Sequence, residues 1–303
     1  MSELFAGIDG GQSSTLAVIG DEGGRILGRG TAGPADEVGG GTESTKLSSA
    51  LRGALEGAWR NAGYAVAPHF AGVVAGVSGY DGRVYGAAPQ LPAQRFSLVH
   101  DAPAAHAGAL AGLPGVVVIA GTGSVVYARD DRGAEATYGG WGFLFGDEGS
   151  AFWLAREALA TMMRAADAGD AALDAETRAA RIFFAVDSLR GIARAFYAGE
   201  IPRERIAAFA PVALSFAAFR TIADRGIAEL AGLTCQALET MVLQRVALCG
   251  GVFADSLMYD GVARAIVARC PQARIEPAKY EPAAGALLLA YREAGLHVTE
   301  LTV

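Results

Sequence analysis

Charged residues are scarce in this sequence, and cysteines are scarcer still. Only 19% of the 303 residues are charged, whereas 52% are hydrophobic. A chain of this composition can bury enough apolar surface to offset its ordering entropy, which excludes an intrinsically disordered protein. The three cysteines, Cys235, Cys249 and Cys270, are odd in number and widely spaced, so they predict buried reduced thiols rather than a disulfide framework. Four histidines without a C-x-x-C motif do not form a persuasive zinc site.

Long apolar runs and basic stripes are also missing. The densest apolar run, Val116–Ala120, has the length of a strand and falls far short of the roughly 18 residues that a membrane span requires. The first residues lack the positive segment and the long apolar segment of a secretory signal. The formal net charge of −7 argues against a nucleic-acid partner. We therefore expect a cytoplasmic protein that binds neither membranes nor nucleic acids.

What the sequence does contain is an alternation of strand and helix signals, which is typical of an α/β fold. The order of strand, glycine turn, strand, acidic turn and strand begins at Leu4 and begins again at Val116. This repetition predicts two similarly built halves. We expect strands at residues 4–9, 15–19, 25–30, 71–77, 96–99, 116–120, 125–129, 134–138 and 246–248, helices at 42–62, 102–111, 255–269 and 282–294, and a largely helical segment at 147–241.

Three of the expected strands run into glycine, in the turns Asp9–Ser14, Gly121–Ser124 and Gly250–Gly251. Glycine lets backbone N–H groups approach an anion closely, and hydroxyl side chains add donors. A single turn of this kind is most often plain turn geometry, but three of them favour a bound polyphosphate. Neither lysine follows a glycine, which excludes a Walker A loop. The second turn has Val126 where the dinucleotide fingerprint needs a glycine.

Two aspartates stand at the ends of expected strands. Asp9 directly precedes the first glycine turn, where a carboxylate repels phosphate unless a cation such as Mg²⁺ intervenes. The alternative, of equal weight, is an aspartate that binds its own turn. Asp101 follows the strand 96–99 and opens the helix 102–111. It is either the N-cap of that helix or a general base at the carboxyl end of a strand, where open α/β sheets place ligands.

The segment Gly139–Ser150 is the most unusual in the chain. Its glycines surround three aromatic residues and two acids, and a helix is expected to start near Ser150. The segment contains more apolar residues than a loop without a function would need. As a site it offers a flat ring for the face of a sugar and a carboxylate for sugar hydroxyls, so we favour a binding site here.

These motifs together resemble the N-acetylglucosamine kinase branch of the BadF/BadG/BcrA/BcrD ATPase family, within the acetate kinase, sugar kinase, Hsp70 and actin superfamily. The resemblance covers nearly the whole chain. The paired motifs G-G-W-G and G-D-E-G-S are specific evidence for this resemblance, whereas each of the other motifs is weak evidence when taken alone. It rests on Asp9-Gly10-Gly11, Val99-His100-Asp101-Ala102, Ile119–Ser124, Gly139-Gly140-Trp141-Gly142, Gly146–Ser150 and Leu248-Cys249-Gly250-Gly251.

The resemblance implies a fold of two ribonuclease H-like lobes with ATP in a central cleft. The lobes would comprise residues 1–112 and 113–281, with the C-terminal helix of 282–303 returning to the first lobe. ATP and Mg²⁺ would be the cofactors, and an amino sugar would be the substrate. A homodimer would be a possible assembly. Asp101 would be the general base for the sugar 6-hydroxyl and Asp9 the residue at the metal. The phosphates and the adenosine would be bound by Gly10, Gly11, Ser13, Gly121, Thr122, Gly123, Gly250 and Gly251, and the sugar by Asp36, Ser124, Gly140, Trp141 and Asp147.

The chain departs from the family pattern at two places. Relatives commonly have glycine and threonine where this chain has Gln12 and Ser13, although Ser13 retains a hydroxyl. Asp36 stands where these kinases usually place a sugar-binding asparagine. An ionised aspartate only accepts hydrogen bonds, whereas asparagine also donates them. Asp36 therefore suits a sugar ammonium, and glucosamine is a rival to N-acetylglucosamine.

Two other classes of function remain as alternatives. An ATPase that activates a radical dehydratase belongs to the same wider family, but it needs cysteines that ligate an iron–sulfur cluster, and the cysteine spacing here is poor for that purpose. A non-catalytic sugar or ATP sensor is the other alternative, and it should tolerate the loss of the Asp101 carboxylate.

Overall fold

The computed structural model describes residues 3–35 and 41–302, which divide into two units. Unit 1 comprises the described residues up to Val117, the short segment Asp131–Gly133 and the residues from Glu276 onward. Unit 2 comprises Val118–Asp130 and Ala134–Ile275. Each unit contains a five-stranded sheet, as the repeated strand pattern of the sequence predicts.

The sheet of unit 1 has the strand order β3-β2-β1-β4-β5. β1 pairs antiparallel with β2 and parallel with β4, and β4 pairs parallel with β5. The turn between β2 and β3 follows from its sequence, because the Asp21 carboxylate accepts hydrogen bonds from the N–H groups of Gly23 and Arg25, and Gly24 adopts a φ of +84°. The strands are β1 (Leu4–Gly10), β2 (Thr15–Asp21), β3 (Ile26–Ala32), β4 (Gly72–Val77) and β5 (Phe96–His100).

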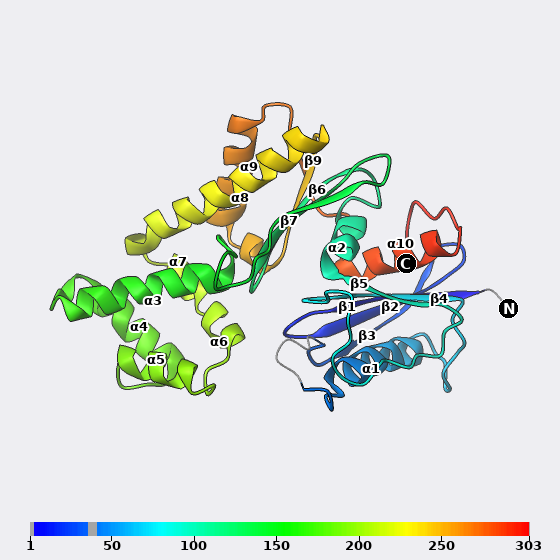
Figure 1. The fold of residues 1–303 in the computed structure, drawn as a ribbon, viewed down its shortest axis with the longest axis horizontal. Helices are drawn as coiled ribbons and strands as arrows, with labels where there is room; N and C mark the ends of the chain where they lie inside the picture. The colour runs from blue at the N-terminus through cyan, green and yellow to red at the C-terminus, as the bar shows by residue number, and fades with distance from the viewer. Residues whose placement is uncertain (1–2, 36–40, 303) are drawn as a thin grey trace. The chain divides into compact units, whose positions relative to one another are not determined.

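Helices cover both faces of this sheet (Figure 1). α1 (Lys46–Asn61) packs against β2 and β3, whereas α10 (Pro282–Glu293) packs against β1, β4 and α2 (Asp101–Ala109). The alternation of side chains along β1 separates the two cores. Residues of β1 such as Ile8 belong to the α1 core, which contains Leu47, Leu51 and Leu55. Phe5 of β1 faces the α10 core instead, which contains Ala283, Leu287 and Tyr291.

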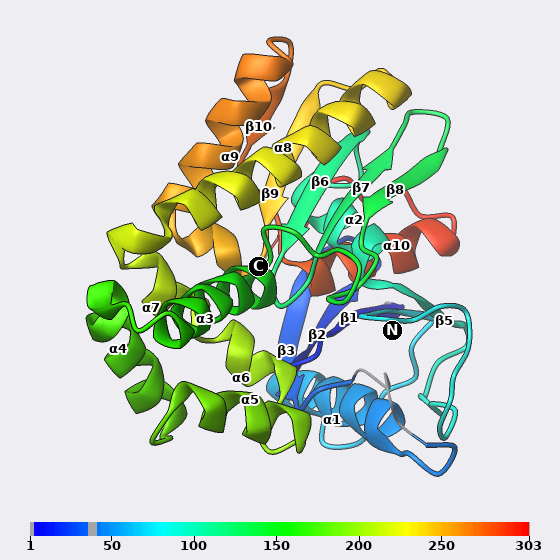
Figure 2. The ribbon, with the colours of Figure 1, turned by 60° about the vertical axis from the view of Figure 1, so that its left-hand side comes forward.

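The sheet of unit 2 has the order β10-β9-β6-β7-β8 (Figure 2). Sequence periodicity predicts four of these strands and misses β10, which has only three residues. Helices α8 and α9 pack against one another. The strands are β6 (Gly115–Ala120), β7 (Ser124–Arg129), β8 (Glu135–Gly139), β9 (Arg245–Cys249) and β10 (Arg274–Glu276), and the two helices are α8 (Arg220–Met241) and α9 (Ser256–Arg269).

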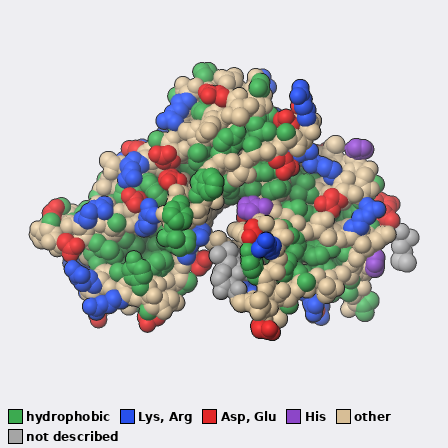
Figure 3. Space-filling view, in the orientation of Figure 1, with side chains coloured by type: hydrophobic (Ala, Val, Ile, Leu, Met, Phe, Trp, Pro, Cys, Tyr) green, Lys and Arg blue, Asp and Glu red, His purple; other side chains and the backbone are tan. Residues whose placement is uncertain are grey.

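The segment before α8 is helical, as expected. Figure 3 shows hydrophobic side chains at the surface over α4 and α5, where Ile182 and Tyr197 are exposed. No single helix among the described residues is long and apolar enough to cross a membrane, and one sharply bent pair of helices passes that test by length and composition when counted together. The remaining helices are α3 (Ala151–Asp167), α4 (Asp174–Phe184), α5 (Leu189–Tyr197), α6 (Arg203–Ala207) and α7 (Ala210–Leu214), with single 3-10 turns at Ala171–Leu173, Ala217–Phe219 and Gly251–Ala254.

Glycine allows α10 to lie unusually close to its neighbours. A Cβ atom on Gly285 would fall on the backbone of Ala104 and Gly108 in α2, and a Cβ on Gly7 of β1 would fall on the backbone of α10. The α10 interface therefore depends on direct backbone packing, where no larger residue fits.

We predict that Gly285→Ala destabilises the protein by about 1–3 kcal/mol, because the added methyl group overpacks a rigid backbone contact. Gly53→Ala is the matched control, since Gly53 also lies within a helix and its Cβ would lie 3.4 Å from the Ala32 Cβ, an ordinary contact distance. This control should gain up to about 1 kcal/mol from helix propensity. Urea unfolding of the two variants checks the prediction, and equal stability would contradict it.

Candidate functional site

The first group of candidate residues lies at the carboxyl ends of β1, β4 and β5 in unit 1. The strand register aligns Asp9 with Gly76, and Gly76 with Val99. A Cβ on Gly76 would lie 3.4 Å from the Asp101 Cα, so Gly76 lies between the two aspartates. The parallel pairing of three strands thus brings Asp9 and Asp101 to one sheet edge.

The two carboxylates at this edge influence one another. Burial, and to a smaller extent the negative charge of Asp101, raise the pKa of Asp9 from 3.8 to about 7. Near neutral pH, Asp9 is therefore close to the midpoint of its titration. A proton or a cation beside Asp9 relieves this repulsion.

Asp101 is not the N-cap of α2, which corrects one of the two interpretations of its position. His100 is the N-cap, and its Nδ1 atom accepts a hydrogen bond of 3.2 Å from the Ala102 N–H. The same Nδ1 atom lies 2.8 Å from the Asp101 Oδ1 atom, a contact in which Nδ1 must carry a hydrogen. Because one nitrogen cannot accept and donate at once, the two contacts belong to different tautomers or protonation states of His100. The hydrogen bond to Asp101 raises the pKa of His100.

The first glycine turn joins β1 to β2 beside these aspartates. The Gly10 carbonyl accepts a hydrogen bond of 2.9 Å from Ser78, and the Gly11 carbonyl accepts one of 3.0 Å from Ala35. Ser13 is exposed, and the Oε1 atom of Gln12 is buried without a hydrogen-bond partner. The predicted sugar contact Asp36 lies outside the described residues.

The donor set at this edge fits a magnesium ion that also binds phosphate. Mg²⁺ is usually held by one or two carboxylates together with waters and substrate phosphates, and Asp9 and Asp101 supply two neighbouring carboxylates. Within residues 3–35 and 41–302, no three histidine, cysteine, aspartate or glutamate side chains group into a metal site made of protein ligands alone. A site shared with phosphate is therefore the kind that the residues suit.

The second group of candidate residues lies in unit 2. The turn after β6 is anchored to the start of α3, because the Gly121 carbonyl accepts a hydrogen bond of 2.8 Å from Ala151. Gly250, with a φ of +106°, lies so close to the backbone of Ala120 that a Cβ there would overlap it. The structure thus places the predicted cofactor residues after β6 and after β9 side by side. Thr122 and Gly123 complete the first of these turns, and Gly251 begins a 3-10 turn.

Ser124 and Asp147 meet next to that turn. The Ser124 hydroxyl donates a hydrogen bond of 2.9 Å to the Glu148 carbonyl, and the Asp147 carboxylate accepts from the Ser124 backbone N–H. Asp147 is only 5% exposed and has a φ of +60°, an uncommon conformation for aspartate. The Nη2 atom of Arg203 lies 3.7 Å from its Oδ2 atom. Sequence analysis misses Arg203, because no local motif marks it.

Three large hydrophobic side chains of Gly139–Ser150 lie at the surface. Trp141, Leu144 and Phe145 are 77%, 71% and 84% exposed. Gly140, with a φ of +70°, packs against Val125 in β7, so the segment lies beside Ser124. Trp141 therefore presents an exposed ring near the Ser124 and Asp147 pair, as a sugar-binding ring would require.

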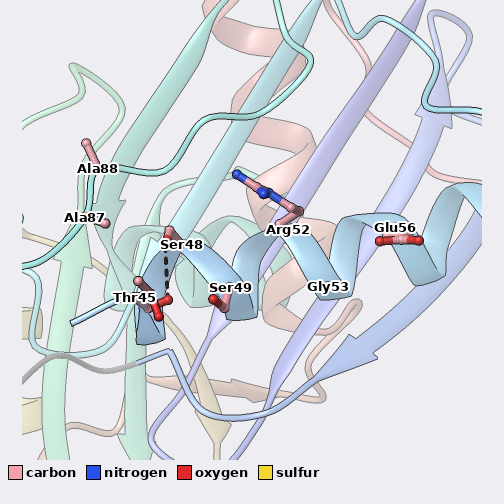
Figure 4. Close-up of a pocket in the computed structure, with 8 residues that line it drawn as sticks. All are labelled: Thr45, Ser48, Ser49, Arg52, Gly53, Glu56, Ala87 and Ala88. Carbon is pink, nitrogen blue, oxygen red and sulfur yellow. Dashed lines mark hydrogen bonds between the residues drawn. The ribbon is translucent and has the colours of Figure 1, made fainter. Parts of the chain in front are cut away.

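A pocket elsewhere in unit 1 does not coincide with these residues. Figure 4 shows it over the first half of α1, where Arg52 and Glu56 point from the helix and Ala87 and Ala88 lie opposite. Ser48 donates a hydrogen bond to the Thr45 carbonyl there. The residues that line this pocket include none of the predicted site residues.

The sequence as a whole matches the model of the BadF/BadG/BcrA/BcrD ATPase family over residues 6–290. An N-acetylmuramic acid/N-acetylglucosamine kinase of Clostridium acetobutylicum is 38% identical over 73 residues, which is 24% of this chain and 24% of that protein. The alignment thus spans about a quarter of the length of this curated relative.

Solved structures match over nearly the full length. A putative N-acetylglucosamine kinase from Chromobacterium violaceum is 27% identical, with a TM-score of 0.80, and the match covers 95% of this chain and 99% of that one. A ROK family glucokinase from Streptomyces griseus, solved with glucose and AMPPNP, is 20% identical with a TM-score of 0.56, covering 95% and 99% of the two chains. The second likeness establishes the fold alone, the actin-like ATPase fold that the sequence predicts.

We predict that Asp9→Asn changes the pH dependence of stability. Because the folded state raises the Asp9 pKa above 3.8, the stability that protonated Asp9 contributes is complete below about pH 4 and is lost as the pH rises to about 7. Relative to Asp9→Asn, the wild type should therefore lose stability across this window, by about 1.4 kcal/mol for each pKa unit at most.

Urea unfolding between pH 4 and pH 8 in the presence of a chelator measures this difference. Asp131→Asn, at an exposed position, controls for the loss of one formal charge. A difference between wild type and Asp9→Asn that stays constant with pH would contradict the prediction.

Proposed function

Since this chain belongs to the BadF/BadG/BcrA/BcrD ATPase family, we propose that it is an ATP-dependent kinase that phosphorylates an amino sugar at the 6-hydroxyl. The neighbouring carboxylates of Asp9 and Asp101 at one sheet edge carry the proposal. They supply a position for a metal–phosphate complex and a base for the acceptor. The full-length similarity to the Chromobacterium violaceum protein supports the sugar as acceptor.

In this proposal Asp101 orients the sugar 6-hydroxyl and accepts its proton as the oxygen attacks the γ-phosphorus. Phosphoryl transfer asks little covalent chemistry of the protein, so positioning and charge stabilisation dominate. Asp101 stands at the first position of α2, and its Oδ1 atom lies 2.8 Å from the His100 Nδ1 atom. A hydrogen on that nitrogen lets His100 orient the carboxylate, and without it the nitrogen caps the helix.

The phosphates of ATP are bound by backbone N–H groups in this proposal. Gly10, Gly11 and Ser13 supply the first turn and Gly121–Gly123 the second, with Gly250 and Gly251 beside the adenosine. Asp9 would hold Mg²⁺ directly or through a water molecule. Mg²⁺ held there would supply positive charge that offsets the negative charge developing during transfer.

In this proposal the sugar is recognised by residues of unit 2 together with Asp36. Asp147 and Ser124 accept or donate hydrogen bonds to hydroxyls, and Trp141 and Gly140 line one face of the ring. Asp36 favours a free amine, which makes glucosamine a candidate beside N-acetylglucosamine. N-acetylmuramic acid is a third candidate substrate, because the name of the Clostridium acetobutylicum relative includes it.

We predict that Asp101→Asn lowers kcat by about 10²–10⁴-fold, because the amide cannot accept the proton. The KM for ATP should change by less than about threefold, since the base does not contribute to ground-state nucleotide binding. A coupled ADP-release assay measures both constants, with Asp131→Asn as the exposed control. Normal turnover by Asp101→Asn would remove Asp101 from the role of base.

The same assay across glucosamine, N-acetylglucosamine, N-acetylmuramic acid, N-acetylmannosamine and glucose tests the proposed function itself. Sugar-dependent ADP release with an amino sugar, and a 6-phosphate product by NMR, would support it. Release of ADP without any dependence on sugar would favour the dehydratase-activator class. Tight sugar binding without turnover would favour a sensor.

A further inference from the structure

Arg203 is a partly buried cation in unit 2 that neither the family motifs nor the proposed chemistry uses. It is the first residue of α6, directly after the N-cap Pro202. Its guanidinium lies over the rings of Phe143 and Phe152, at 5.2 and 5.8 Å from their centroids. The side chain is 21% exposed, and its Nε atom is buried without a hydrogen-bond partner. A cation placed this way costs free energy unless a negative charge faces it.

The charge that faces Arg203 is the carboxylate of Asp147. The Nη2 and Oδ2 atoms are 3.7 Å apart, and the Asp147 side chain is 6% exposed. Burial raises the pKa of Asp147 and the nearby Glu148 carboxylate raises it further, whereas the backbone N–H groups of Ser124 and Gly142 and the Arg203 charge lower it. Arg203 is thus the cationic side chain that favours the ionised form of this buried acid.

The turn after β6 lies against the Asp147 and Arg203 side chains. A Cβ atom on Gly123 would lie 2.8 Å from the Asp147 Oδ2 atom and 3.3 Å from the Arg203 Nη2 atom. The glycine therefore leaves the space in which the carboxylate and the guanidinium meet. The backbone N–H of Ser124, the next residue, donates to Asp147. Three separate segments thus hold one carboxylate in one orientation.

We propose that Arg203 is a positioning residue for the sugar, which acts by keeping Asp147 ionised and oriented toward the hydroxyls of the acceptor. This inference rests on the proposed function. It adds a residue that acts through Asp147 and does not touch the reacting atoms. Ionised Asp147 accepts hydrogen bonds only, so the site selects an acceptor that offers hydroxyl donors to it.

The test uses Arg203→Met, which retains an apolar stem over the two phenylalanine rings, and Arg203→Lys, which retains the charge. We predict that Arg203→Met raises the KM for the amino sugar about 10-fold or more, the usual value of a hydrogen bond to a charged group. The KM for ATP should stay within about twofold. The acidic limb of kcat/KM for the sugar should move to higher pH, because Asp147 becomes harder to ionise without the cation. Arg203→Lys should restore the position of that limb.

Arg190→Met is the matched control, because Arg190 pairs with Asp167 on the surface of the same unit, where the two side chains are 81% and 71% exposed. It should leave both KM values and the pH profile unchanged. A folded Arg203→Met enzyme with wild-type sugar KM and pH profile would overturn the proposal. If Arg203→Met does not fold, Arg203→Gln, which also removes the charge, takes its place, and an Arg203→Gln enzyme with wild-type sugar KM and an unchanged ¹³C-NMR titration of Asp147 overturns the proposal.

The outcomes separate this inference from the proposed function. If the wild type phosphorylates none of the sugars, the kinase proposal fails. The Asp147 titration, followed by carboxyl ¹³C NMR in the free protein, then decides the role of Arg203. A pKa of Asp147 that rises in Arg203→Met supports the coupling, and an unchanged pKa overturns it.

Discussion

The chemistry of unit 1 depends on the burial of two like charges at one sheet edge. Parallel pairing of β1, β4 and β5 fixes Asp9 and Asp101 as neighbours, and Gly76 between them has no side chain to hold them apart. Burial disfavours the ionised form of Asp9, and the like charge of Asp101 disfavours it further, so the pKa of Asp9 rises to about 7. Ionising both carboxylates costs free energy unless a proton or a cation binds beside them. A metal–phosphate complex is a partner that this edge suits, because it brings positive charge and uses few protein ligands.

The buried carboxylate of unit 2 has a neighbour of opposite charge. Asp147 has a fixed guanidinium as its neighbour, whereas Asp9 has a second carboxylate. A permanent counter-charge favours the ionised form of an acid and fixes its orientation. A carboxylate without one favours a proton or a cation as its neighbour. The two carboxylates therefore differ in their electrostatic surroundings, although burial raises the pKa of both.

The sequence predicts the fold well where the signal is local. Apolar runs find nine of the ten strands within a few residues, and the acidic turn after Asp21 forms because its side chain caps its own backbone. Prediction from the sequence fails where a pattern is too short or where the interacting residues are far apart in the chain. The three residues of β10 are too few for a period, and histidine is an unusual N-cap, so His100 goes unnoticed and Asp101 takes its place. Arg203 meets Asp147 only through tertiary packing.

The same reasoning explains why the nucleotide is easier to predict than the sugar. Phosphates are bound by backbone N–H groups, so their sites appear in a sequence as glycine at strand ends, whatever the side chains nearby. A sugar is distinguished by side chains whose effect depends on charge state and orientation. The pKa of Asp147 depends on burial and on the neighbouring Ser124, Arg203, Glu148 and Gly142, and Arg203 lies outside its motif. The electrostatic surroundings of this acid are therefore a property of tertiary packing as well as of the motif, and sequence similarity in the motif alone does not determine them.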